Sequence, residues 1–325
     1  MRYKFLGIDI AAAKFDAALL GEDDRYRQHI FPNTTPGFKA LTAWLNRHNT
    51  ADLQVCMEAT GSYGWSLAQH LHQAGLKVSI VNPACIKAFA QSELQRTKTD
   101  RADARVIARF CRAMQPTLWQ PPAPEVAELQ ALVRRLEELT TMRTQETCRL
   151  KAPGGSALVQ ASRNKMLANI SQEMTALQRA LKALFQRYPA LKAKRDLLTS
   201  IPGIGELTAN TLLAENAPGI GCKNARQLAA YAGLVPKLRQ SGSSVRGKPR
   251  LSKQGNARLR KALYWPAIVA MRYNPPLRAF AQRLQLAGKT KMVIIGALMR
   301  KLIHLVFGIL KSQRPFNPNY KPSWA

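Results

Sequence analysis

The sequence predicts an α/β domain followed by a long and mostly α-helical region. In the first 120 residues, short apolar runs of strand length alternate with stretches whose apolar residues have helical spacing. A proline-rich boundary follows over Pro116–Pro124, with four prolines in nine residues. Beyond it, apolar residues recur at spacings of three and four, which is typical of helices. We therefore expect three parts, over residues 1–120, 121–197 and 198–325.

The α/β part is predicted to contain five strands and three helices. Pro36 suits a helix start, and Thr99 suits an N-cap because its hydroxyl can accept a backbone hydrogen bond. The order of three strands, helix, strand, helix, strand and helix is that of a ribonuclease-H-like domain, in which the first and fourth strands are neighbours. The strands are expected over Tyr3–Ile10, Phe15–Leu20, Arg27–Phe31, Leu53–Glu58 and Lys77–Val81, and the helices over Gly37–Arg47, Trp65–Ala74 and Thr99–Ala113.

Two long helices are predicted for the middle part, over Glu125–Lys151 and Ser162–Arg187, separated by a break at Pro153–Ser156. The apolar spacing in the first of them indicates a coiled coil or helical hairpin. A helix packed on its own domain explains the spacing equally well. That spacing is carried by Leu129, Leu132, Leu136 and Leu139. From Leu197 onward the chain is predicted to be helical and basic, with a loop over Gln240–Gly255.

The formal charge of +30 is unevenly distributed. After Leu150 there are 30 basic and 4 acidic residues, and no carboxylate side chain follows Glu215. Such a surface indicates a polyanionic partner, most commonly nucleic acid. An anionic membrane is the alternative, which we weigh lower because the apolar run Met292–Met299 is followed directly by Arg300 and Lys301.

The N-terminus begins directly in a strand-like segment, so we expect no signal peptide. The five cysteines are widely scattered, without a CxxC spacing. We therefore expect neither disulfides nor a structural zinc site, and we expect a cytoplasmic protein.

Four acidic residues are candidates for a metal site. Asp9 and Glu58 end the first and fourth strands, and Asp100 and Asp103 lie three apart on one helical face. Carboxylate oxygens favour Mg²⁺, and two such ions can stabilise both oxygens in phosphoryl transfer. A solvated helix face is the alternative for the last two acids. We expect a further acid, Asp16, at the surface or in support of the ligands.

The basic part contains a glycine-rich turn, Ile201–Gly205. Gly203 and Gly205 would let backbone N–H groups approach a phosphate, as in a helix-hairpin-helix. An ordinary turn between two helices is an equal alternative.

The segment Ser241–Arg250 combines hydroxyl groups with cations. This segment suits a loop that contacts phosphates. The alternative is that one of its serines is a nucleophile, whose base would then have to come from another segment, because this one holds neither a histidine nor an acid. Tyr264, Trp265 and Tyr273 are expected in the core or at phosphates rather than at bases. The cations predicted to contact nucleic acid are Arg246, Lys248, Arg250, Lys253, Arg258 and Arg260.

Several motifs together resemble transposases of the insertion-sequence 110 family, over nearly the whole chain and in the same order. The resemblance implies a first domain similar to the Holliday-junction nuclease RuvC, a coiled-coil middle and a C-terminal transposase domain. It also implies that Asp9, Glu58, Asp100 and Asp103 bind Mg²⁺ and that Ser241 forms a phosphoserine with DNA. The motifs are GIDIAAAKFD, MEATGSY, VNPACIKAFAQSE, RTKTDRADAR, IPGIGELTA and AYAGLVPKLRQSGSSVRGKPRLSKQGNARLRKALY.

The resemblance further implies partners and an assembly. A bridge RNA would pair with donor and target double-stranded DNA, and two homodimers would form a tetramer in which the serine of one protomer completes the metal site of another. The implied function is RNA-guided excision and insertion of a mobile element. A hydrolytic RuvC-like junction nuclease, or a non-catalytic RNA- or DNA-binding protein, is the alternative. One departure is Ala12, where relatives commonly have lysine, although Lys14 is retained.

Overall fold

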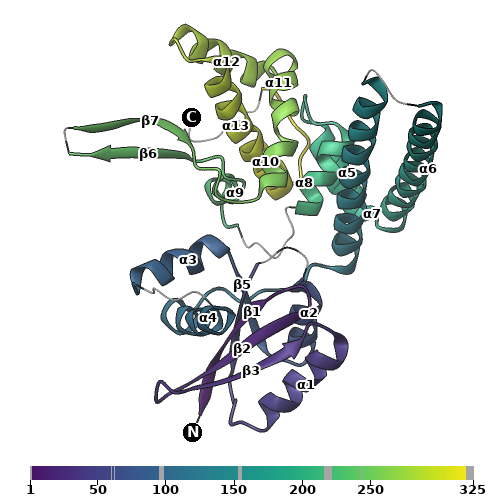
Figure 1. The fold of residues 1–325 in the computed structure, drawn as a ribbon. Helices are drawn as coiled ribbons and strands as arrows, with labels where there is room; N and C mark the ends of the chain where they lie inside the picture. The colour runs from purple at the N-terminus through teal and green to yellow at the C-terminus, as the bar shows by residue number, and fades with distance from the viewer. Residues whose placement is uncertain are drawn as a thin grey trace. The chain divides into compact units, whose positions relative to one another are not determined.

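The computed structural model describes residues 2–59, 61, 63–94, 99–152, 156–215, 222–242 and 244–319. Most of the expected break at Pro153–Ser156 lies outside these residues. The chain forms two compact units, Met1–Pro121 and Pro122–Ala325, and each is described by itself (Figure 1). The first boundary agrees with the proline-rich segment, whereas the expected division near residue 197 stays a prediction.

The first unit is built on a five-stranded mixed sheet with the order β3-β2-β1-β4-β5. The strand β1 pairs antiparallel with β2 and parallel with β4, while β2–β3 and β4–β5 are antiparallel and parallel pairs. This order confirms the predicted fold class and makes the first and fourth strands neighbours. The strands are β1 (Tyr3–Ile10), β2 (Lys14–Gly21), β3 (Tyr26–Pro32), β4 (Gln54–Glu58) and β5 (Lys77–Val81).

Helices cover both faces of this sheet. One face packs on α1 (Thr35–Asn46) and α2 (Trp65–Gln73), and the other on α3 (Pro83–Ser92) and α4 (Asp100–Met114). The sequence analysis did not predict α3, although Asn82 caps it by accepting a hydrogen bond from the N–H of Ala84 at 2.9 Å. Thr99 caps α4 as predicted, accepting from the N–H of Ala102 at 3.2 Å.

A glycine allows α4 to lie directly against β1. A Cβ atom at Gly7 would stand 2.1 Å from the carbonyl oxygen of Ala104 and 2.3 Å from the nitrogen of Ala108. Any other residue at this position would therefore push α4 away from the sheet. Since side chains alternate along a strand, Asp9 lies on the same face as Gly7, beneath α4.

The second unit is mostly helical and has one shared core. The long helices α5 and α6 pack side by side (Figure 1), and buried residues of both join the core cluster that continues to the last helix. Leu129, Leu136 and Leu139 of the predicted stripe are buried. The helices are α5 (Pro124–Lys151), α6 (Ala157–Arg187), α7 (Pro189–Thr199), α8 (Glu206–Glu215), α9 (Ala225–Tyr231), α10 (Ala257–Ala262), α11 (Tyr264–Tyr273), α12 (Pro275–Leu286) and α13 (Lys291–Ser312).

Two features of this unit differ from expectation. Most of the loop predicted over Gln240–Gly255 is a β-hairpin of β6 (Pro236–Ser241) and β7 (Val245–Leu251), because the two segments pair in antiparallel register. The helix α13 is long and apolar enough to cross a membrane by length and composition, which the sequence analysis did not expect. Half of its most apolar window is buried inside the unit, as in the core helix of a folded domain.

Candidate active site

Asp9 and Glu58 lie side by side at one edge of the sheet. Ile8 of β1 is in register with Met57 of β4, and the two strands are parallel. The next residues are Asp9, one residue before the end of β1, and Glu58, the last residue of β4, and their side chains lie on the same face. Cys56, two residues before Glu58, packs in the cluster that contains residues of α4, which identifies this face as the one that α4 covers.

The helix α4 contributes the other two predicted acids. Asp100 and Asp103 both lie in its first turn, where the backbone N–H of Asp103 donates to the carbonyl oxygen of Thr99 at 2.8 Å. The Thr99 cap sets where the helix begins, and the contact at Gly7 sets how close it comes to β1. Together these features bring both carboxylates toward the end of β1.

The pKa of Asp9 indicates that these acids lie close together. Burial raises the pKa of Asp9, and the charges of Asp103, Asp100, Glu58 and Asp16 add to this shift, so that together they raise the pKa to about 6. The other three predicted ligands and Asp16 therefore act on one half-buried carboxylate. Within the described residues, however, no three Asp, Glu, His or Cys side chains form a preformed metal cage.

The donor set nevertheless fits a hard divalent cation. The converging groups are carboxylates, whose oxygen atoms are the ligands that Mg²⁺ prefers. The pKa of Asp9 is raised first by burial and then by the negative charges of the neighbouring acids. A bound cation would relieve the repulsion between these carboxylates.

A lysine bridges the site to a buried acid. Lys14 Nζ lies 2.9 Å from Asp100 Oδ2 and 3.3 Å from Asp16 Oδ2. Hydrogen bonds to Asp100 and Asp16 raise the pKa of Lys14, and its hydrogen bond lowers the pKa of Asp100. Asp16 is only 3% exposed and pairs in register with Asp9, so it supports the site and is not a surface residue.

The role of Lys14 in joining these groups was not predicted from the sequence. The signal that could have found it is strand alternation, because residues 14 and 16 lie on one face of β2. Ala12 lies in the exposed turn between β1 and β2. Among the described residues, Lys14 supplies a cation to this site through its ion pair with Asp100.

Ser241 is the last residue of β6, in the second unit. Its backbone pairs with Val245, and Gly242 follows with a left-handed φ of 53°, which glycine adopts without strain. Ser241 thus stands where the hairpin turns. The side chains of Ser241, Arg246 and Lys248 lie outside the part of the structure that is described.

Two of the arginines predicted to contact nucleic acid bind to other groups within the second unit. Arg260 donates through Nη1 to the carbonyl oxygens of Ala232 and Lys253, each at 3.2 Å. Arg258 Nη1 lies 3.7 Å from the buried Glu215 carboxylate. The binding of nucleic acid by Arg258 and Arg260 stays a prediction. The side chains of Arg250 and Lys253, which were also predicted to contact nucleic acid, are exposed.

The predicted glycine turn joins α7 to α8. Gly203 has a φ of +107°, and a Cβ there would come within 2.8 Å of the carbonyl oxygen of Pro266 in α11. This glycine is therefore required by packing inside the unit. Gly205 has open space around it at the start of α8 and is the one that a phosphate could approach.

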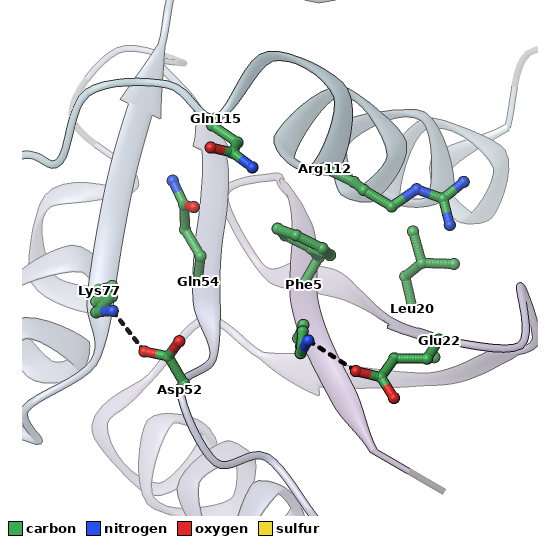
Figure 2. Close-up of a pocket in the computed structure, with 10 residues that line it drawn as sticks. Phe5, Leu20, Glu22, Asp52, Gln54, Lys77, Arg112 and Gln115 are labelled. Atoms are coloured by element: carbon green, nitrogen blue, oxygen red, sulfur yellow. Dashed lines mark hydrogen bonds and ion pairs between the residues drawn. The ribbon is translucent and has the colours of Figure 1, made fainter.

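A cleft of the first unit lies at the opposite end of the strands from the acids. It has a volume of about 500 Å³ and is lined by the beginnings of β1, β4 and β5 (Figure 2). Lys4 pairs with Glu22 at 2.7 Å, and Lys77 pairs with Asp52. These cations are neutralised within the cleft, and it shares no residue with the acidic site.

Comparison with known proteins agrees with this arrangement. The model of the IS110 DEDD transposases matches residues 6–153, and that of the IS116/IS110/IS902 transposases matches residues 195–282. The chain is 36% identical over 321 residues to pilin gene-inverting proteins of Moraxella bovis and Moraxella lacunata, covering 98% of each chain. It is also 27% identical over 275 residues to the transposase for insertion sequence element IS1328 of Yersinia enterocolitica, covering 74% of this chain and 79% of that protein. The chain therefore belongs to the IS110 family, and its activity is that of a DNA transposase or recombinase.

Proposed function

We propose that the protein is an RNA-guided DNA recombinase that excises and inserts a mobile element through a phosphoserine intermediate. The observation that carries this proposal is the convergence of Asp9, Glu58, Asp100 and Asp103 at one edge of a ribonuclease-H-like sheet. A serine at the turn of a cationic hairpin, in the other unit of the chain, supplies the second component.

The four carboxylates would hold two Mg²⁺ ions. When bound, these ions polarise the scissile phosphate and favour ionisation of the attacking hydroxyl. Lys14 holds Asp100 in place and supplies a positive charge beside the site.

Ser241 performs the chemical step in this proposal. Its Oγ forms a bond to phosphorus while its proton passes to water, and the bond to the 3′ oxygen breaks. The departing 3′ oxygen takes up a proton. The 3′ hydroxyl of an exchanged strand then attacks the phosphoserine, which restores both the diester and the serine. Since the ester conserves the energy of the broken bond, no nucleotide cofactor is needed.

The partners are a bridge RNA together with donor and target double-stranded DNA. Base pairing would select the sequences, while the basic second unit grips the backbones. We also propose that homodimers assemble into a tetramer in which the serine of one protomer meets the acids of another, and that the protein acts in the cytoplasm. A transcript of the flanking DNA that copurifies with the protein, and redirects recombination when its pairing segments are changed, is the test of guidance.

The serine step is tested by trapping the covalent intermediate. Ser241→Ala should abolish both the denaturation-resistant protein–DNA adduct and strand transfer, with nucleic-acid binding retained. The matched control is Ser244→Ala, in the same turn, which should keep the adduct. Cleavage by Ser241→Ala without any adduct would instead identify a hydrolytic nuclease, and absence of cleavage in the unsubstituted protein would indicate a binding protein.

A further inference from the structure

The helix α11 exposes two large aromatic side chains. Trp265 is 70% exposed and Tyr273 is 69% exposed, with the exposed Val269 halfway between them. Positions 265, 269 and 273 lie on one side of a helix. Of the two positions expected for these rings, in the core or at phosphates, the core is therefore excluded. An exposed apolar stripe of this kind marks a surface that receives a partner.

The opposite side of α11 holds the stripe in a fixed position. Pro266, Ala267 and Ala270 are buried in the unit, and the turn at Gly203 packs against this side of the helix. The ring of Tyr264 meets that of Trp265 edge to face, with centroids 5.6 Å apart. A partner would thus meet at least one ring that is already oriented, which reduces the entropy lost on binding.

The charges beside the stripe favour an anionic partner. Arg272 is exposed in the same two turns of α11, and no carboxylate side chain follows Glu215 in the sequence. A second copy docking through this face would bring two arginines together without an acid from the same region of the chain. Nucleic acid offers both a negative backbone and flat bases that stack on aromatic rings.

Unpaired bases fit the stripe better than a duplex does. In a duplex the faces of the bases are already stacked on one another, so exposed rings have nothing to cover. Residues 265 and 273 are separated by about 12 Å along the helix axis, at about 1.5 Å per residue. Each ring therefore receives its own base, and Arg272 lies between the two along the helix.

We propose that Trp265 and Tyr273 form a stacking platform for unpaired bases of a single-stranded nucleic acid, with Arg272 on its phosphates. The platform rests on the proposed function only in that its partner is a nucleic acid with unpaired segments. It requires neither the acids nor Ser241. It assigns these rings to a binding role that is independent of strand cleavage.

The test measures binding of labelled oligo(U), oligo(dT) and a hairpin duplex of equal length by fluorescence anisotropy in EDTA. Trp265→Ala and Tyr273→Ala should each weaken single-strand binding about fivefold or more, the range expected for loss of one stacked base. Duplex binding should change less than about twofold. Trp265→Phe should restore most of the affinity, and Leu286→Ala, which removes a 90% exposed apolar side chain from α12, should change nothing.

Salt dependence separates stacking from charge. Trp265→Ala should leave the slope of log affinity against log salt unchanged, whereas Arg272→Gln should reduce it by about 0.7 for a single strand. Equal losses for duplex and single strands would overturn the platform. So would unchanged single-strand binding combined with loss of self-association, measured by light scattering, which would identify a second copy as the occupant.

The outcome is independent of the chemistry proposed for Ser241. Ser241→Ala should bind single strands like the unsubstituted protein. If the adduct is never formed but the aromatic variants lose single-strand affinity, the recombinase mechanism fails and the platform stands. If the adduct forms while the aromatic variants bind single strands normally, the platform fails and the mechanism stands.

Discussion

At the scale of the residue, Asp9 is the group on which burial and neighbouring charges act in the same direction. Its pKa of about 6 in the folded protein lies above the ordinary value of 3.8. The folded state therefore holds this proton more tightly than the unfolded state does. In metal-free protein this contribution to stability is full below about pH 4 and is lost as the pH rises through 6.

Asp9→Asn should consequently stabilise the metal-free protein at pH 7.5. After allowance for solvent screening at this half-buried site, we expect about 1–2 kcal/mol in the free energy of unfolding. The measurement is denaturant unfolding in EDTA, with the exposed Asp23→Asn as the control. Mg²⁺ should then stabilise the unsubstituted protein but not Asp9→Asn, which should also lose cleavage. A destabilised Asp9→Asn in EDTA would contradict the proposed charge repulsion.

At the scale of the element, the position of α4 depends on Gly7. A methyl group there overlaps the helix backbone at 2.1 Å, so Gly7→Ala must displace α4 together with Asp100 and Asp103. We expect a loss of about 2–3 kcal/mol in stability and a large drop in Mg²⁺-dependent cleavage. Thermal unfolding and a cleavage assay measure the two effects.

The control for Gly7→Ala is a glycine with room for a methyl group. A Cβ at Gly308, within α13, would meet nothing within 4 Å. Gly308→Ala should therefore be neutral or stabilising by up to about 1 kcal/mol, because alanine is the better helix former. Equal effects of the two substitutions would mean that the contact between α4 and β1 does not position the acids.

Three helices of the second unit are joined by one buried carboxylate. Glu215 of α8 accepts from Arg134 Nε of α5 at 2.9 Å, and from Asn256 Nδ2, at the start of α10, at 2.9 Å. Burial alone would raise the pKa of Glu215, but these hydrogen bonds and the charges of Arg134 and Arg258 outweigh burial and lower it. Its contribution to stability is therefore full above about pH 4.5 and is lost as the pH falls below that value.

Glu215→Gln should destabilise the protein by about 2–4 kcal/mol at pH 7, because it leaves arginine charges without their counterion. Glu206→Gln, at the exposed first turn of the same helix, should cost less than about 1 kcal/mol. Urea unfolding at pH 7 and pH 3.5 measures both. The difference between Glu215→Gln and the unsubstituted protein should shrink at pH 3.5. A difference that persists there would show that packing, and not charge, holds the three helices.

At the scale of the whole molecule, charge and chemistry are divided between the two units. Residues 1–121 hold 15 basic and 10 acidic residues, a net charge of +5, whereas residues 122–325 hold 34 and 9, a net charge of +25. All four candidate metal ligands are in the first unit. The second unit therefore supplies most of the attraction to nucleic acid.

This division predicts how nucleic-acid binding responds to salt. Duplex affinity, measured by anisotropy in EDTA, should fall by about a hundredfold or more between 50 and 200 mM salt. Asp9→Asn and Ser241→Ala should show the same slope, because neither removes a phosphate contact. A slope that becomes shallow in either variant would place that residue in the binding surface and not in the chemistry.

The local pattern of the chain was enough to predict the sheet, the Thr99 cap, the placement of Asp9 and Glu58 near the ends of neighbouring strands, and the basic second half. Periodicity, capping and charge act between residues close in sequence, so these features follow from spacing alone. The burial of Asp16, the bridge from Lys14 to Asp100, the hairpin that carries Ser241 and the exposed rings of α11 did not follow from it. Each depends on which distant segment lies against the residue, and only the tertiary structure decides that, because burial and pairing are properties of contacts between elements.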